Sequence, residues 1–205
     1  MRSTPLIHVV DDDDSLRTAL LRLLEAAGFE ARGYVSTGAF LLQPSDDGPG
    51  CILLDVRMPG PSGLELQSAL QRQGVALPII FLTAYADVAS SVRAMKAGAV
   101  DFLEKPVERD TLLDALQRAL TRDAGERRAR DDAHSLRARV ESLTPREREV
   151  FDRVVAGKLN KQIADELGIG ERTVKAQRAQ VMLKLGVDSA AELGRLAEQF
   201  QRTSS

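Results

Sequence analysis

The stretch "LIHVVDDDDSL", residues 6–16, decides how the chain begins to fold. Five mostly apolar residues precede four consecutive aspartates, and leucines at helical spacing follow them. A short apolar run that ends abruptly in polar residues predicts a buried strand. A single Asp after a strand is ordinary, because Asp caps helix N-termini and favours the positive end of the helix dipole. Four adjacent carboxylates repel one another and need a further explanation.

The same alternation of a short apolar run and a helical pattern continues through the first 120 residues. After the helical pattern that ends at Gly28 comes a weak strand over residues 31–35. Three stronger runs follow: "CILLD" (51–55), "PIIFLT" (78–83) and "AVDFLEKP" (99–106). Buried strands that alternate with amphipathic helices predict a parallel sheet with helices on both faces. We therefore expect an α/β domain with a five-stranded, doubly wound parallel sheet over residues 1–120.

The remaining 85 residues have a different character. Residues 121–142 are rich in both signs of charge and predict a solvated, largely helical linker, with Gly125 as a weak point. Residues 143–205 contain three short helical patterns, each closed by a glycine, and a fourth one after them, which predicts a small all-α domain. Residues 1–120 carry a net charge of −5, whereas residues 121–205 carry +3. Such an asymmetry suggests different partners for the two parts.

Composition narrows the class of protein further. Cys51, the single cysteine, lies in an apolar run and reads as a small buried hydrophobe in a reducing compartment. No apolar stretch reaches the roughly 20 residues that span a bilayer, and the N-terminus lacks a signal-peptide pattern. We expect a cytoplasmic protein with no membrane partner.

Polar residues stand where the predicted strands end. In a parallel sheet these ends lie on one rim, where functional crevices form. Clustered carboxylates raise one another's pKa unless a cation lies among them, and a hard dication with oxygen ligands resolves the repulsion. Nearby His and Cys ligands are lacking, so Mg²⁺ suits the donors better than Zn²⁺. Asp13 and Asp14 are expected to start the first helix instead. The rim residues are Asp11, Asp12, Asp55, Thr83 and Lys105.

Four segments, "VVDDD", "LLDVRMPGPSG", "FLTA" and "KAGAVDFLEKP", in this order and spacing, resemble the receiver domain of two-component response regulators. The resemblance covers about residues 4–120. It implies that Asp55 is the phosphoacceptor, which takes a phosphoryl group from a phosphohistidine on a sensor histidine kinase. It also implies that Asp12, Asp55 and the backbone carbonyl of Arg57 bind Mg²⁺ directly, with Asp11 acting through water.

The resemblance assigns further roles beside the phosphoacceptor. Thr83 is expected to hydrogen-bond the phosphoryl oxygens and Lys105 to pair with them. The peptide bond between Lys105 and Pro106 is expected to be cis, which is cheap only before proline. Phe102 stands at the aromatic switch position, although core packing alone would also explain a Phe there.

The segment that begins "LTPREREVFDRVVAG" resembles the LuxR-type helix-turn-helix, as carried by the NarL/FixJ family of response regulators, over about residues 143–200. Within it, "NKQIADELGIGERTVKAQRA", residues 160–179, corresponds to the helix-turn-helix proper. We expect Lys175 and Arg178 to reach the major groove of DNA and Gln177 to be able to bond a base edge. Lys161, Thr173 and Lys184 are candidates for phosphate contacts. For any one of these residues a solvated basic helix face is the alternative. Packing positions are expected at Ile163, Ala164, Leu167, Ile169, Val174, Val181 and Leu185, and Gly170 stands where Ser or Thr usually caps the second helix.

The function expected from these features is a phosphorylation-switched transcriptional regulator that binds double-stranded promoter DNA as a homodimer, and not an enzyme. One alternative keeps DNA binding but makes the receiver a protein-interaction module that needs no phosphate. A second alternative, a metal-dependent phosphohydrolase on the same sheet, leaves the helix-turn-helix unexplained.

Overall fold

A computed structural model describes residues 4–43, 48–85 and 87–203 of the chain. It divides into two compact units, residues 1–127 and 128–205. Each unit is described by itself below. Among the described residues, no helix is both long and apolar enough to cross a membrane.

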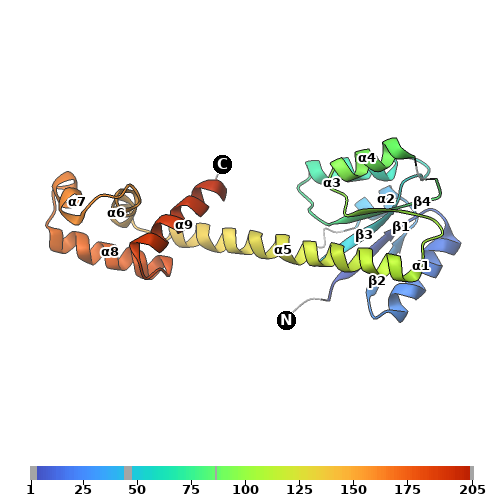
Figure 1. Cartoon of the computed structure of the whole chain (residues 1–205), viewed down its shortest axis with the longest axis horizontal. Helices are drawn as coiled ribbons and strands as arrows, with labels where there is room; N and C mark the ends of the chain where they lie inside the picture. Colours follow the sequence, from blue (N-terminus) through green and yellow to red (C-terminus); the bar gives the residue numbers. More distant parts are fainter. Residues whose placement is uncertain (1–3, 44–47, 86, 204–205) are drawn as a thin grey trace. The chain divides into compact units, whose positions relative to one another are not determined.

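The first unit is built on one sheet of five parallel strands (Figure 1). The strands are β1 (Leu6–Val10), β2 (Glu30–Tyr34), β3 (Gly50–Asp55), β4 (Ile79–Thr83) and β5 (Asp101–Glu104). Their order in the sheet is β2-β1-β3-β4-β5. The helices between them are α1 (Asp14–Ala26), α2 (Thr37–Leu41), α3 (Gly63–Arg72) and α4 (Val88–Lys96), and α5 (Arg109–Glu141) follows β5. The predicted doubly wound sheet is confirmed.

Side-chain alternation along the strands produces a separate core on each face of the sheet. Ile7 and Val9 of β1 are fully buried against α1 and α5, while Val10 faces the layer of α2, α3 and α4 (Figure 1). Cys51 is buried in the first of these cores, as expected. Because both faces are covered, the central strands read as continuous apolar runs, which is why the sequence pattern located them.

Strand order and register bring the acidic rim together. β1 and β3 are neighbours, and Val10 lies opposite Leu54 in the ladder. The next residues of the two strands, Asp11 and Asp55, therefore emerge side by side at the carboxyl edge. Gly63 is required where α3 begins, because a Cβ at this position would lie 2.2 Å from the carbonyl oxygen of Asp55. This close approach holds α3 against the end of β3.

The helix α5 contains residues 121–141 of the segment 121–142 that is predicted as a charged linker, and it continues through Gly125. Not all of this segment is solvated. Asp123 is only 1% exposed and accepts a hydrogen bond from Gly50 N in the first unit. Leu136 and Val140 are buried in the core of the second unit. The domain limits at residues 120 and 143 stay predictions.

The second unit packs the end of α5 with α6 (Pro145–Val155), α7 (Asn160–Leu167), α8 (Glu171–Leu185) and α9 (Ala190–Thr203). The four predicted helices are confirmed. Thr144 and Glu147 form a capping box at the start of α6, and Gly168 and Gly186 end α7 and α8 in the left-handed conformation. The predicted packing residues are buried or partly buried in this core: Ile163, Ala164, Leu167, Ile169, Val174, Val181 and Leu185.

Candidate functional site

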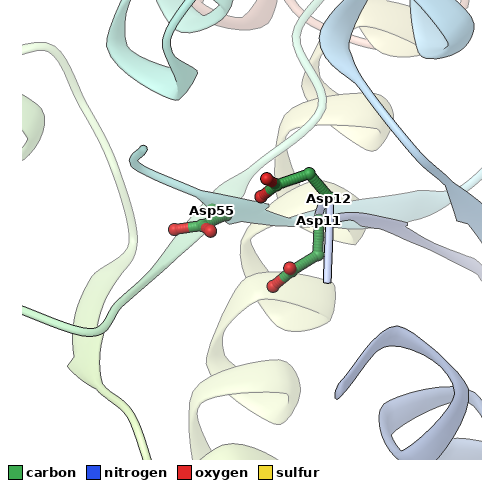
Figure 2. Close-up of side chains that lie close together, drawn as sticks. All are labelled: Asp11, Asp12 and Asp55. Carbon is green, nitrogen blue, oxygen red and sulfur yellow. The ribbon is translucent and has the colours of Figure 1, made fainter. Parts of the chain in front are cut away.

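Three carboxylates converge at the carboxyl edge of the sheet (Figure 2). Asp11, Asp12 and Asp55 each offer one oxygen, and these three oxygens lie within 4.8 Å of one another. Asp11 is 1% exposed and Asp55 7%, whereas Asp12 is exposed. An all-oxygen set with an open side suits a hard dication that keeps several of its waters, as Mg²⁺ does. The donors present therefore fit the metal that the sequence predicts.

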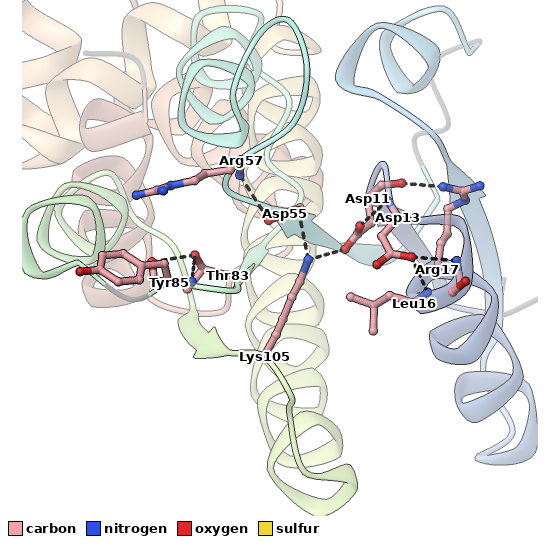
Figure 3. A network of polar contacts seen from close by, with 10 residues as sticks. Asp11, Asp13, Leu16, Arg17, Asp55, Arg57, Thr83, Tyr85 and Lys105 are labelled. Atoms are coloured by element: carbon pink, nitrogen blue, oxygen red, sulfur yellow. Dashed lines mark hydrogen bonds and ion pairs between the residues drawn. The ribbon is translucent and has the colours of Figure 1, made fainter.

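Lys105, just after β5, provides the positive charge of this cluster (Figure 3). Its Nζ lies 2.7 Å from Oδ2 of Asp11 and 3.0 Å from Oδ2 of Asp55. Burial alone would lower the pKa of Lys105, but hydrogen bonds and charge from the two carboxylates outweigh it and raise that pKa. The ammonium group is therefore fixed in its charged form between the two acids.

Asp55 is the carboxyl of this cluster whose charged form is disfavoured by its surroundings. Burial raises the pKa of its carboxyl, and the hydrogen bonds from Lys105 and from the backbone N–H of Arg57 offset this only in part. The N–H of Arg57 donates to Oδ1 of Asp55 at 3.2 Å. The carboxylate is thus held in place from both oxygens, and its charged form gains from any additional cation placed beside it.

The Thr83 hydroxyl, at the end of β4, is bonded within its own loop. It donates to the carbonyl oxygen of Tyr85 at 3.0 Å and accepts from the Tyr85 N–H at 3.2 Å (Figure 3). A contact with a phosphoryl group on Asp55 would require this hydroxyl to exchange partners. The assigned role of Thr83 stays a prediction.

Tyr85 and Asp87, which contact Arg57 at this edge, were not predicted from the sequence. The guanidinium of Arg57 lies 5.5 Å from the centre of the Tyr85 ring, and one of its nitrogens is 3.9 Å from Oδ2 of Asp87. Asp87 also caps α4 by accepting a hydrogen bond from Ser90 N. Tyr85 and Asp87 follow no strand-end or helix pattern beyond an ordinary cap, so nothing in the sequence singled them out.

The predicted switch residues, Phe102 and Pro106, lie in β5 and just after it. Phe102 of β5 is partly buried and packs against the core on the α4 side, with its ring 5.9 Å from that of Phe81. This contact shows the packing role, and the switch role stays a prediction. The Lys105–Pro106 bond is cis, as expected.

The second unit displays the predicted DNA-contacting residues on α7 and α8. Lys161, Thr173 and Lys175 are exposed, whereas Gln177 and Arg178 are half-buried. Arg178 donates to the side-chain oxygen of Asn160 at 3.0 Å, which ties α8 to the start of α7.

Lys184, a candidate phosphate contact, is engaged inside the unit. Its Nζ lies 2.6 Å from Oε2 of Glu147, the residue that completes the capping box of α6. A hydrogen bond from Lys184 lowers the pKa of Glu147. This ion pair gives Lys184 a structural role, and its contact with phosphate stays a prediction.

Comparison with known proteins agrees with this geometry. Residues 7–117 match the model of the response regulator receiver domain, and residues 141–197 match that of the bacterial regulatory proteins of the luxR family. The chain is 43% identical to nodulation protein W of Bradyrhizobium diazoefficiens over 94% of this chain and 85% of that protein. It is also 43% identical to the transcriptional regulatory protein FixJ of Azorhizobium caulinodans, over 93% of this chain and 90% of that protein.

Solved structures give the same result. The response regulator StyR shares 46% identity with a TM-score of 0.88, over 96% of this chain and all of that one. Full-length FixJ from B. japonicum shares 41% identity with a TM-score of 0.59, over 98% of this chain and 99% of that one. The chain therefore belongs to the NarL/FixJ family of two-component response regulators, as a transcriptional regulator with a receiver domain and a LuxR-type DNA-binding domain.

Proposed function

We propose that Asp55 is the residue of this regulator that accepts a phosphoryl group, from a phosphohistidine on a sensor histidine kinase. One observation carries the proposal: the buried Asp55 carboxylate lies 3.0 Å from Lys105 Nζ and within 4.8 Å of the oxygens of Asp11 and Asp12. This edge of the sheet thus combines a nucleophile, a fixed cation and the ligands for a second one.

The chemistry asks little of the protein beyond placement and charge. One carboxylate oxygen of Asp55 attacks phosphorus, the P–N bond to the histidine breaks, and the electron pair stays on the imidazole nitrogen, which takes up a proton. Lys105 neutralises negative charge that develops beside Asp55. Mg²⁺ held by Asp11, Asp12, Asp55 and the carbonyl of Arg57 would neutralise charge on the phosphoryl oxygens. The product is a modified protein, so we propose a signalling role and not steady-state catalysis.

Phosphoryl mapping tests the acceptor directly. The chain is incubated with acetyl phosphate and Mg²⁺, digested, and analysed by mass spectrometry. We expect one added phosphoryl group per chain, on the peptide that contains residue 55, and none when a chelator removes the metal. A stable phosphoryl group on any other peptide contradicts the assignment.

We further propose that phosphorylation favours a homodimer through the face formed by α4, β5 and α5. The α4 side of this face carries exposed apolar side chains: Tyr85 (66% exposed), Val88 (78%), Val92 (44%) and Met95 (46%). On the β5 and α5 side of this face, Arg118 of α5 pairs with Asp101 of β5. An apolar stripe with charged neighbours is typical of a reversible interface. Thr83 and Phe102, which flank the site, would pass its state to this face.

We propose that α8 enters the major groove of promoter DNA. Lys175 lies in the first half of α8 and is exposed, which is where recognition helices contact bases. Thr173, near the start of α8, and Lys161, near the start of α7, are exposed and suit phosphate oxygens. Gln177 and Arg178 lie one turn further along. Because a kinase's phosphohistidine and promoter DNA are cytoplasmic partners, we also propose that the protein acts in the cytoplasm.

The two classes of DNA contact make different predictions. We expect Lys175→Ala to cost about 1–3 kcal/mol on a duplex selected by the wild-type protein and much less on random DNA, because a base contact carries sequence information. Lys161→Ala should weaken binding to both duplexes similarly and lower the slope of log affinity against log salt by about 1. Fluorescence anisotropy at several salt concentrations measures both effects. Equal losses on the two duplexes for Lys175→Ala contradict the base contact.

A further inference from the structure

We propose that Arg17 of α1 is a positioning residue for the metal-binding carboxylate of Asp11, an inference that rests on the proposed Mg²⁺-dependent phosphorylation of Asp55. Its Nη1 donates to the backbone carbonyl oxygen of Asp11 at 2.7 Å, and its Nη2 bonds the carboxylate of Asp14 (Figure 3). The guanidinium therefore lies behind the acidic turn, on the side away from Lys105.

Asp11 is held by four hydrogen bonds, and the one from Arg17 fixes its carbonyl. The N–H of Asp11 donates to Tyr34 O at 3.1 Å, which extends the pairing of β1 with β2 by one residue. Its Oδ1 accepts from Asp13 N at 2.9 Å, and its Oδ2 accepts from Lys105 at 2.7 Å. Asp11 is 1% exposed, so its carbonyl would be costly to leave without a partner. The Arg17 contact thus sets the orientation of the peptide that follows Asp11, and with it the path from β1 into the acidic turn.

Gly33 of β2 leaves the space that the Arg17 side chain occupies. Gly33 lies inside β2, where glycine is otherwise unfavourable. A Cβ added there would lie 3.1 Å from Cδ and 3.2 Å from Cγ of Arg17, and 3.0 Å from Cδ1 of Leu21. The aliphatic stem of Arg17 therefore crosses over Gly33, and the side chain is only 12% exposed. An extended stem packed in this way leaves the guanidinium little freedom.

Removal of the guanidinium should change the Mg²⁺ affinity in opposite directions if Arg17 acts through its charge or through positioning. A measured affinity therefore distinguishes the two roles. Loss of a positive charge near three carboxylates would strengthen Mg²⁺ binding. The field of Arg17 is already opposed by its partner Asp14, however, so the loss of orientation should dominate. Outer groups that orient metal ligands typically contribute about 10- to 100-fold to metal affinity.

Isothermal titration calorimetry of the full chain with Mg²⁺ alone tests the inference. We expect Arg17→Met, which keeps an apolar stem, to weaken Mg²⁺ binding by about 10-fold or more. The matched control is Arg22→Met, which removes the same charge from the exposed face of the same helix and should leave the affinity unchanged. Arg17→Met with wild-type or tighter Mg²⁺ binding overturns the proposal.

A second variant tests the inference independently if Arg17→Met does not fold. Gly33→Ala keeps the guanidinium but displaces its stem, and it should weaken Mg²⁺ binding in the same direction by a smaller factor; unchanged affinity counts against the inference. Failure of this inference is distinguishable from failure of the proposed function. If the wild-type chain binds no Mg²⁺, the metal site itself is wrong. If the wild-type chain binds Mg²⁺ and Arg17→Met binds it equally well, only the role of Arg17 is wrong.

Discussion

Asp55→Asn is expected to abolish phosphorylation of the chain by acetyl phosphate. The amide lacks the anionic oxygen that attacks phosphorus, and it removes one of the three carboxylates whose oxygens lie within 4.8 Å. Both changes act on the same step, so no residual transfer at this site is expected. Incorporation of label from acetyl phosphate in the presence of Mg²⁺, compared with the wild-type chain, gives the measurement. Continued labelling of the variant at the wild-type rate would mean that another group is the acceptor.

The same variant must be shown to fold, and its stability has a predicted sign. Burial raises the pKa of Asp55 even with Lys105 beside it, so the folded state disfavours the charged carboxylate. Above its folded pKa, the wild-type chain without metal therefore carries a destabilisation that Asn lacks. Asp55→Asn should be more stable than wild type at pH 7, and this difference should shrink as the pH falls toward the ordinary value of 3.8.

Urea unfolding in the presence of a chelator, at pH 7 and near pH 4, measures this difference. The pair of pH values matters because acids distant from residue 55 titrate equally in both chains and cancel in the comparison. A variant that is less stable than wild type at pH 7 would show that the pairing with Lys105 outweighs burial. Added Mg²⁺ should stabilise the wild-type chain more than the variant, because only the wild type has the full set of ligands.

Beryllofluoride, which mimics an acyl phosphate, is expected to raise the affinity of the full chain for its DNA by about 100-fold or more. Dimerisation converts the second DNA contact into an intramolecular event, so two weakly binding units gain through effective concentration. Phosphate contacts make the affinity depend strongly on salt, and the comparison must use one ionic strength. Equal affinity with and without beryllofluoride would favour the alternative in which the receiver acts without phosphorylation.

A substitution on α4 separates dimerisation from the chemistry of the site. Val92→Glu places a charge on the exposed apolar side of α4, and we expect it to abolish the beryllofluoride effect while leaving phosphorylation of Asp55 intact. Leu42→Glu is the matched control, because Leu42 is also an exposed apolar residue of the receiver but lies after α2. In the presence of beryllofluoride, analytical ultracentrifugation should show a dimer for Leu42→Glu and a monomer for Val92→Glu. Loss of the dimer in both variants would contradict the proposed face.

The sequence predicted the arrangement of the acidic edge because local rules and topology act together there. A short apolar run that stops at an acid indicates a strand end, and parallel strands bring their ends to one edge. Asp11 and Asp55 are 44 positions apart in the sequence, yet the register that pairs Val10 with Leu54 leaves them side by side. The same reasoning located Lys105 after β5, and the structure places its Nζ between the two carboxylates.

The sequence by itself determined the elements, the two sheet-facing cores and the set of carboxylates, because these follow from periodicity, capping and strand ends. The helix-turn-helix packing positions followed from the family resemblance. Only the tertiary structure decided which polar and charged side chains bond to which partners. It paired Lys184 with Glu147, turned the Thr83 hydroxyl to Tyr85, and laid Arg17 across Gly33 to bind the Asp11 carbonyl. The physical reason is range. Helical and strand periodicity are set by neighbours within a few residues, whereas a long polar side chain finds its partner through the packing of distant segments, which a single sequence does not specify.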